Sequence, residues 1–92
     1  MLSVIIPCFN EEKLVKSSVL ETLKAIKLSK INKYEIIFID DGSEDRSCLI
    51  VESLRKKNKN IKIIKNKKNF GIGYNFFKGV RKSKGKHLIQ IP

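Results

Sequence analysis

The sequence has no tryptophan, only two cysteines and a single histidine in 92 residues. Cys8 and Cys48 lack Cys-x-x-Cys or Cys/His spacing, which disfavours a structural zinc site and a disulfide framework and fits a reducing compartment. The apolar run after Met1 has no basic segment before it and no long hydrophobic core, so we expect no secretory signal. No apolar stretch approaches the roughly 20 residues of a membrane-spanning helix. We therefore expect a cytoplasmic chain.

Acidic residues are also scarce, since nine Asp and Glu oppose twenty Lys and Arg and leave a formal net charge of +11. Such a charge attracts nucleic acid, anionic lipid or phosphorylated ligands and does not by itself choose among them. The lysines gather without aromatics at Arg55–Asn60 and around Lys67, which disfavours a stacking platform for single-stranded nucleic acid. We interpret both stretches as a solvated helix end and a loop, with peripheral contact to an anionic membrane as the other interpretation.

Four short apolar runs alternate with segments of helical periodicity. The runs are Leu2–Ile6, Tyr34–Ile39, Ile61–Ile64 and His87–Ile91. This alternation predicts one domain over residues 1–92 with the order β-α-β-α-β-α-β. Because the first two runs are continuously apolar and β-branched, they should be central parallel strands covered by helices on both faces. The predicted fold is α/β, three layers α/β/α around a mostly parallel sheet with strand order 3-2-1-4.

The first helix is expected over about residues 11–29. Its apolar residues recur at helical spacing: Val15, Val19, Leu23 and Ile26. The second helix should run to about Lys57, with Ser43 or Asp45 accepting a backbone N–H at its start. The third helix should end before Gly85, placed there in a left-handed conformation. The face that it buries should consist of Gly73, Phe77 and Val80.

Ligands of open parallel sheets bind beyond the carboxyl ends of the strands, at the point where the strand order reverses. In the predicted order this switch point lies between the first and the fourth strand. Three loops should therefore line one crevice, namely Pro7–Glu12, Asp40–Asp45 and Asn66–Gly73.

The first two of these loops carry the polar residues that are best suited to contact a ligand. Asn10 and Glu11 can serve as a helix cap and as a carboxylate at the positive end of the helix dipole, or they can contact a ligand. Asp40 and Asp41 are adjacent carboxylates at the end of a strand that should be buried, where like charges raise each other's pKa or require partners. One acid would suffice as a cap, so we interpret the pair as a ligand site. A carboxylate can accept a hydrogen bond from the imide of a base or from ribose hydroxyls.

The third loop carries Gly71-Ile72-Gly73 at a helix start, a pattern that can expose N–H groups to phosphate and is weak alone. It lacks the third glycine of the dinucleotide fingerprint and is not a P-loop, because no Gly-Lys-Ser/Thr follows. A response-regulator receiver would carry its acids after the first strand rather than the second. His87 stands at a strand start, away from the carboxyl ends, and we assign no catalytic residue and no metal ligand.

Three motifs follow one another along nearly the whole chain. They are Ser3–Glu11, Glu35–Asp45, and Asn69–Gly73 together with Gly79 and Gly85. In this order and spacing they resemble the family 2 glycosyltransferases of the GT-A (nucleotide-diphospho-sugar transferase) fold. The resemblance implies that the loops hold the nucleotide of a sugar donor, usually uridine or guanosine diphosphate. The residues that it implies for this site are Pro7, Cys8, Asn10 and Glu11 around base and ribose, Asp41 on the base, Asp40 supporting the nucleoside, and Gly71.

By the same resemblance the complete enzyme transfers a sugar from a UDP- or GDP-sugar to an acceptor hydroxyl, in polysaccharide or glycolipid synthesis. It should use a divalent metal, Mg²⁺ or Mn²⁺, bound by an Asp-x-Asp motif. The chain ends at Pro92 before such a motif, so we expect a truncated N-terminal part that is inactive alone. Its truncated sheet should expose an apolar strand edge and self-associate. The alternative is a non-enzymatic basic α/β module that binds nucleic acid or anionic membrane. That alternative explains the lysines but not the acidic pair, and we expect no nucleic acid partner.

Overall fold

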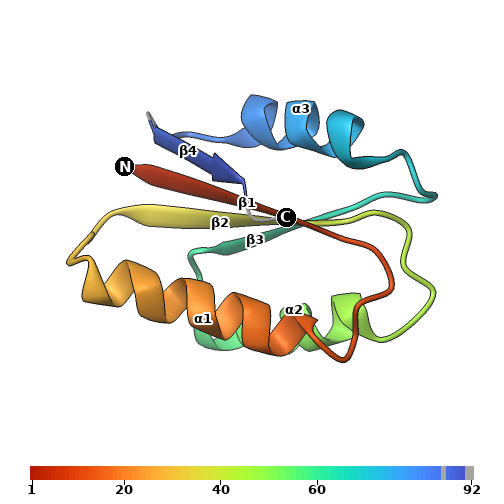
Figure 1. Ribbon diagram of the computed structural model, residues 1–92, viewed down its shortest axis with the longest axis horizontal. Coiled ribbons are helices and arrows are strands. Elements are labelled where there is room, and N and C mark those ends of the chain that lie inside the picture. Colours follow the sequence, from red (N-terminus) through yellow and green to blue (C-terminus); the bar gives the residue numbers. More distant parts are fainter. Residues whose placement is uncertain (86, 91–92) are drawn as a thin grey trace.

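The computed structural model describes residues 1–85 and 87–90 (Figure 1). Strands and helices alternate as predicted, in the order β1 (Leu2–Cys8), α1 (Val15–Leu28), β2 (Tyr34–Asp40), α2 (Ser47–Lys57), β3 (Ile61–Lys65), α3 (Ile72–Lys82) and β4 (His87–Gln90). The predicted last strand also included Ile91, which lies outside the described residues. All strand pairings are parallel, and the order β3-β2-β1-β4 confirms the prediction. The switch point therefore lies between β1 and β4.

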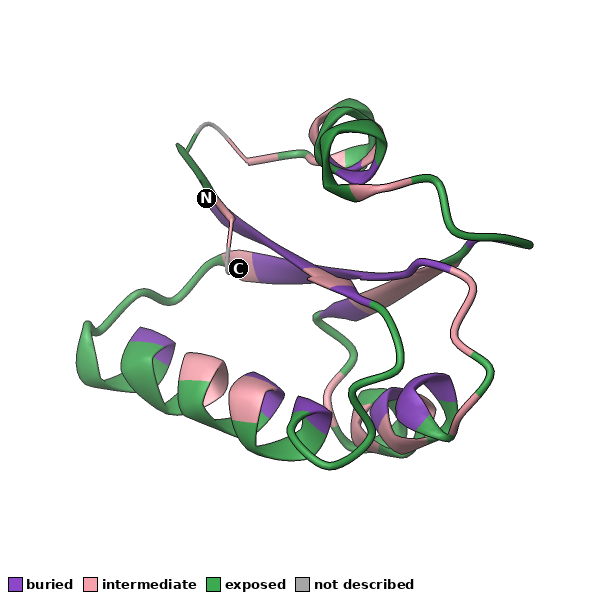
Figure 2. Ribbon diagram, turned by 45° about the vertical axis from the view of Figure 1, so that its right-hand side comes forward, coloured by how far each residue is buried: buried purple, intermediate pink, exposed green. Residues whose placement is uncertain are grey.

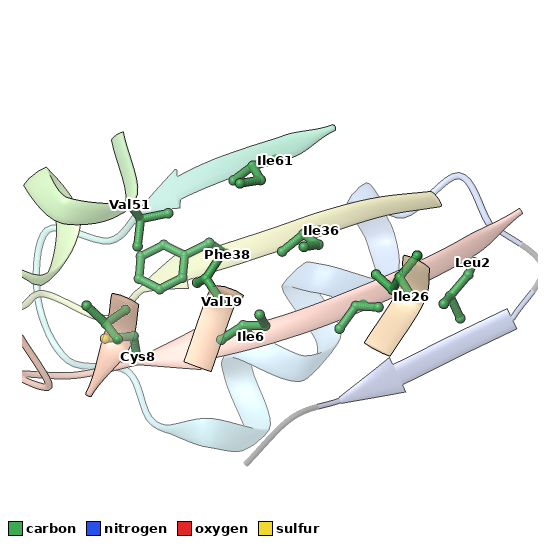
Figure 3. Close-up of a cluster of buried hydrophobic side chains, with 11 residues drawn as sticks. Leu2, Ile6, Cys8, Val19, Ile26, Ile36, Phe38, Val51 and Ile61 are labelled. Atoms are coloured by element: carbon green, nitrogen blue, oxygen red, sulfur yellow. The ribbon is translucent and has the colours of Figure 1, made fainter. Parts of the chain in front are cut away.

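Helices cover both faces of the sheet and complete the three predicted layers. In Figure 1, α1 and α2 lie together on one face and α3 lies on the other. The central strands β1 and β2 are consequently buried on both faces, as their apolar runs predict. The larger hydrophobic cluster packs beneath α1 and α2 around Phe38 and Val19 (Figure 3). Beneath α3 the buried core is Ile5, Ile37 and Ile39. None of the helices described here is both long and apolar enough to cross a membrane.

The start of α1 lies at Val15, later than the expected start near residue 11. Residues 12–14 form a turn instead, and the N–H groups of Leu14 and Val15 donate to the Glu11 carbonyl oxygen at 2.9 Å. Asn10 stands in the left-handed region with a φ of 50°. The backbone N–H groups of residues 10–12 donate to side chains of the β2–α2 loop and of Ser47, the first residue of α2. Because these N–H groups bond to another segment, residues 11–14 do not belong to the helix that the apolar pattern predicted.

The α2 helix ends at Lys57, as predicted, and its N-cap residue is Arg46. Of the two residues predicted to accept a backbone N–H at the helix start, Asp45 does so. Asp45 Oδ1 accepts from the backbone N–H of Ser47 at 2.9 Å and from its Oγ at 2.6 Å. Ser43 is not a cap, because its Oγ accepts from the N–H of Asn10 at 2.9 Å. The predicted role of Ser43 is therefore wrong, since its hydroxyl joins two loops.

The α3 helix faces the sheet with other residues than the apolar pattern selected. The predicted buried face was Gly73, Phe77 and Val80, but the first two are exposed and the last is half-buried. The residues that α3 buries are Asn75 and Gly79, and Figure 2 shows this helix exposed around most of its circumference. A Cβ at Gly79 would stand 2.8 Å from Ile5 Cδ1, so the glycine lets the helix approach β1 closely. Hydrophobic periodicity failed here because the inward residues are a glycine and an amide.

The connection from α3 to β4 also differs from the prediction at Gly85. The α3 helix ends at Lys82, and the glycines in the left-handed region are Gly42 and Gly71. The predicted left-handed conformation of Gly85 is therefore wrong. This glycine is required for space instead, because a Cβ there would lie 2.5 Å from Ser3 Oγ.

Candidate functional site

The three predicted loops meet beyond the carboxyl ends of β1, β2 and β3, at the right-hand side of Figure 1. Between them lies a hollow of about 230 Å³, called the crevice below. Its wall consists of Pro7, Cys8, Phe9, Glu11, Asp41, Asn69, Gly71, Ile72 and Asn75. The crevice thus combines the first loop, the end of β2, the third loop and the first turns of α3.

Most of the predicted site residues come together in this wall. They are Pro7, Cys8, Glu11, Asp41 and Gly71. Asn10 and Asp40 belong to the same loops but do not line the crevice. The contacts with a nucleotide that the family resemblance implies for these residues remain predictions.

Asn10 joins the first loop to the second and does not cap α1. Its Oδ1 accepts from the N–H of Glu44 at 2.8 Å, and its own N–H donates to Ser43 Oγ at 2.9 Å. Two further bonds of this kind run from Glu11 N–H to Ser47 Oγ at 2.9 Å and from Glu12 N–H to Asp45 Oδ2 at 3.1 Å. These four bonds hold the first loop against the start of α2 and keep Glu11 at the crevice.

Asp41 organises the third loop from a buried position, with 4% of its surface exposed. Its Oδ1 accepts from the N–H of Phe70 at 2.8 Å and from Asn66 Nδ2 at 3.0 Å. Its Oδ2 accepts from the N–H of Gly71 at 3.0 Å. Burial alone would raise the pKa of Asp41, but these hydrogen bonds outweigh burial and hold the pKa below its usual range. The carboxylate is therefore charged at neutral pH. The N–H of Gly71, which the sequence pattern suggested for phosphate binding, donates to Asp41 instead.

Asp40 lies on the other side of the second loop. It is 1% exposed, and its Oδ1 accepts from the N–H of Ser43 at 3.2 Å. It borders a second hollow of about 620 Å³ between the second and third loops. The wall of this lysine hollow includes Lys65, Lys67 and Lys68. The two carboxylates predicted to act as a pair thus border different hollows, and only Asp41 reaches the crevice.

Two buried asparagines support the crevice and were not predicted as site residues. Asn75 lines it and is 1% exposed, whereas Asn66 lies behind Asp41 and is 5% exposed. Asn66 Nδ2 donates to Asn75 Oδ1 at 2.7 Å, and Lys78 Nζ donates to Asn66 Oδ1 at 2.8 Å. The sequence feature that could have identified Asn75 is its position one turn before Gly79, on the face of α3 that approaches the sheet most closely. Asn66 has no comparable signal beyond following β3.

Cys8 contributes shape rather than reactivity to the crevice. It is buried, and burial raises the pKa of the Cys8 thiol although a hydrogen bond with Ser47 opposes the change. The thiol is therefore protonated at neutral pH. A protonated and buried thiol is a poor nucleophile.

The side chains present do not fit the divalent ion that the family resemblance implies. Within residues 1–85 and 87–90, no three His, Cys, Asp or Glu side chains lie close enough together to hold a metal. Asp40 and Asp41 border separate hollows, and both oxygens of Asp41 already accept N–H groups. We therefore derive no step of chemistry through a metal from these residues.

Comparison with known proteins identifies relatives over nearly the whole chain. The sequence profile of glycosyl transferase family 2 matches residues 3–91. A dolichyl-phosphate beta-glucosyltransferase of Dictyostelium discoideum is 38% identical, with 98% of this chain and 29% of that protein covered. The chain spans 27–37% of the length of the curated relatives that it matches.

Solved structures share the fold described above. S. aureus TarS 1-349 in complex with UDP has a TM-score of 0.77 at 27% identity, over 98% of this chain and 26% of that one. The mannosyltransferase PcManGT from Pyrobaculum calidifontis, in complex with GDP-Man and Mn2+, has a TM-score of 0.77 at 19% identity. It covers 95% of this chain and 25% of its own, and at this identity it shows the fold alone. The profile match, together with the parallel sheet and its strand order, shows that this chain belongs to glycosyl transferase family 2 and has the GT-A fold.

Proposed function

We propose that the crevice binds the nucleoside of a sugar-nucleotide donor, and that the whole protein transfers the sugar to an acceptor. The observation that supports this proposal is the convergence of Pro7, Glu11, Asp41 and Gly71, from three separate loops, on one crevice at the carboxyl edge of the sheet. The UDP bound by TarS and the GDP-Man bound by PcManGT support the same class of ligand.

The crevice suits the base and ribose better than an entire nucleotide sugar. Its volume of about 230 Å³ is below the roughly 300–1,000 Å³ of pockets that enclose drug-sized ligands. Phe9 and Ile72 present exposed apolar surface at its rim, which a planar base can cover. Asp41 offers a charged acceptor inside, and Glu11 offers a second carboxylate in reach of ribose hydroxyls. The diphosphate and the sugar would then extend out of the crevice.

A titration of the chain with UDP and with GDP, each with and without Mn²⁺, tests the proposal by calorimetry. Because only part of the donor is enclosed, we expect weak binding that produces heat at millimolar nucleotide. We also expect no sugar transfer by the 92-residue chain. A folded sample that produces no heat at this concentration contradicts nucleotide binding, and turnover of a sugar nucleotide contradicts the expected inactivity.

The proposal for the whole protein also includes its acceptor, its metal and its location. The name of the Dictyostelium relative supports a lipid-linked acceptor and thus glycolipid or polysaccharide synthesis. The Mn2+ of the PcManGT complex supports a divalent metal, although the residues described here supply no ligand set for it. We also propose a cytoplasmic protein whose basic surface makes peripheral contact with an anionic membrane.

A basic binding module is the second candidate, favoured by the net charge of +11 and by the lysine hollow. Ionic strength separates the two candidates, because a polyanion binder releases counterions and loses affinity steeply with salt. A nucleotide held by Asp41 and the wall of the crevice should lose much less affinity as the salt concentration rises. Parallel titrations with UDP and with duplex DNA at 50 and at 200 mM salt therefore decide between them.

Self-association through β4 is a further part of the proposal. In the described part of the chain β4 pairs with β1, and Leu88 and Ile89 are 40% and 48% exposed. An apolar strand edge favours pairing with another chain. Light scattering should show a mass that rises with protein concentration, and a monomeric mass at every working concentration contradicts this part.

A further inference from the structure

The outer side of α3 carries aromatic rings that are largely exposed. Asn75 and Gly79 are the residues that this helix buries. Phe77 stands two residues from each of them, about 200° round the helix, so it points away from the sheet and is 70% exposed. Tyr74, three residues before Phe77, is 47% exposed. In Figure 1 α3 lies alone on its face of the sheet, and no other helix of the described residues packs over these rings.

Phe70 extends this surface into the third loop. Its ring is stacked on the ring of Tyr74 with the centroids 4.5 Å apart, and it is 43% exposed. Phe70, Tyr74 and Phe77 are together called the aromatic face below. Exposed rings that gather on one side of a molecule indicate contact with a membrane or with another macromolecule. Because Phe70 stands in the chain between Asn69 and Gly71, which both line the crevice, the aromatic face begins at the crevice.

The charged side chains of α3 are all positive, and they flank the aromatic face. A hollow of about 350 Å³ on this side of the helix is lined by Tyr74, Phe77, Lys78, Arg81 and Lys82. No acidic residue occurs after residue 52 of the sequence, whereas thirteen of the twenty Lys and Arg do. Aromatic rings beside cations, without acids among them, are typical of helices that lie in the plane of an anionic bilayer.

We propose that the aromatic face docks on an anionic lipid bilayer, an inference that rests on the proposed peripheral membrane contact and locates it. Tyr74 and Phe77 enter the headgroup region of the bilayer. Arg81 and Lys82 keep their charged ends at the lipid phosphates, because their long side chains can reach past the rings. The crevice, where the aromatic face begins, is then close to the bilayer, so the donor sugar meets a lipid-linked acceptor at the membrane surface.

The contacts within the aromatic face favour a bilayer over single-stranded nucleic acid. A base stacks on the free face of a ring, but Phe70 and Tyr74 are stacked on each other. Lys68 Nζ lies 5.3 Å from the centroid of the Phe70 ring, and Lys78 Nζ lies 5.6 Å from that of Tyr74. These rings therefore offer apolar area rather than a free ring face. A second copy of this chain is disfavoured, because the cations of α3 would face each other across a two-fold axis.

Co-sedimentation of the 92-residue chain with vesicles of phosphatidylserine and phosphatidylcholine, in equal parts, tests the inference. Arg81→Gln combined with Lys82→Gln should weaken binding about 25-fold, since each base at an anionic surface contributes about fivefold. Arg55→Gln combined with Lys56→Gln is the matched control. It makes the same change in the last turn of α2, on the opposite face of the sheet, and should weaken binding less than about threefold.

A second measurement reports directly on the surface that touches the bilayer. The sequence has no tryptophan, so one introduced by substitution reports on its own position alone. Phe77→Trp should shift its fluorescence emission to shorter wavelength when vesicles are added, because the indole leaves water. Leu49→Trp is the control, since Leu49 is 61% exposed on α2 and should show no shift. Both side chains are exposed, so neither substitution disturbs the core.

The possible results separate this inference from the other proposals. An equal loss of binding in the two double variants, or an emission of Phe77→Trp that vesicles leave unchanged, overturns the aromatic face as the docking surface. Tighter binding to a single-stranded oligonucleotide than to the vesicles, at the same salt concentration, overturns the choice of a bilayer. A wild-type chain that does not bind the vesicles overturns this inference and the proposed membrane contact together. The titration with UDP decides nucleotide binding in each of these cases.

Discussion

Replacement of Gly42 by alanine tests how the second loop supports the third. Gly42 follows Asp41 and has a φ of 79°, in the left-handed region. A Cβ at this position would lie 2.7 Å from the carbonyl carbon of Lys68 and 2.9 Å from the backbone nitrogen of Asn69. Backbone atoms cannot rotate away as the end of a side chain can. The third loop therefore has to move away from the second loop in the Gly42→Ala variant.

The expected cost has two parts. A non-glycine residue in the left-handed region loses roughly 1–2 kcal/mol. Movement of the third loop also weakens the hydrogen bonds from the N–H groups of Phe70 and Gly71 to Asp41, and a bond to a charged group contributes about 1.5–3 kcal/mol. Because these bonds are stretched rather than removed, we expect a total loss of about 2–4 kcal/mol. That is a large share of the roughly 5–14 kcal/mol expected for a domain of this length.

Urea unfolding followed by circular dichroism measures this loss, and the amide resonances of Phe70 and Gly71 report on the third loop. Gly73→Ala is the matched control, because a Cβ there meets nothing within 4 Å and its φ is not in the left-handed region. Alanine within α3 should stabilise the chain by up to about 1 kcal/mol. The reasoning is refuted if Gly42→Ala unfolds at the same urea concentration as the wild type with both resonances unmoved.

Three further changes probe the charges and close contacts described above. The low pKa of Asp41 means that its carboxylate stabilises the fold above the unfolded pKa and that this stability is lost as pH falls through the folded pKa. The wild type should therefore lose stability below about pH 4 more steeply than Asp41→Asn, and parallel curves in acid unfolding would contradict this. Lys62→Met removes the partner, at 2.6 Å, of the buried Glu35 and should cost about 1–2 kcal/mol in urea unfolding, whereas Lys62→Arg should cost less. Gly85→Ala forces a Cβ against Ser3 Oγ and should accelerate hydrogen exchange in β4 but not in β3, so equal acceleration in both strands would argue against a local contact.

The sheet and its order were predictable because few alternatives satisfy the physics. β1 and β2 carry apolar runs that only a doubly covered strand can bury, and right-handed crossovers then leave few orders for the remaining strands. Asp41 was predictable for a related reason, since a carboxylate at the end of a buried strand requires partners. The partners themselves, the N–H groups of Phe70 and Gly71, lie about thirty residues away and have no local pattern.

The separation of Asp40 from Asp41 was not predicted, although simple geometry explains it. Successive side chains of an extended segment point to opposite sides, so adjacent acids at the end of a strand border different spaces. The face of α3 is a different kind of failure. Asn75 and Gly79 carry little hydrophobicity, and their inward position follows from close approach to Ile5 and from the buried amide of Asn66. The buried face of such a helix can be identified only when the position of the neighbouring strand is known.

The four hydrogen bonds between residues 10–12 and 43–47 have a consequence for how affinity can be tuned. Each bond joins the main chain of one loop to a side chain of the other, so neither loop rearranges alone. A ligand then meets a wall that is already in place and little loop ordering has to accompany binding, which leaves the dissociation rate as the adjustable quantity. Ser43 and Ser47 lie outside the wall of the crevice, yet their hydroxyls position Glu11. Exchange of either serine should shorten the residence time of a bound nucleotide without removing a single direct contact.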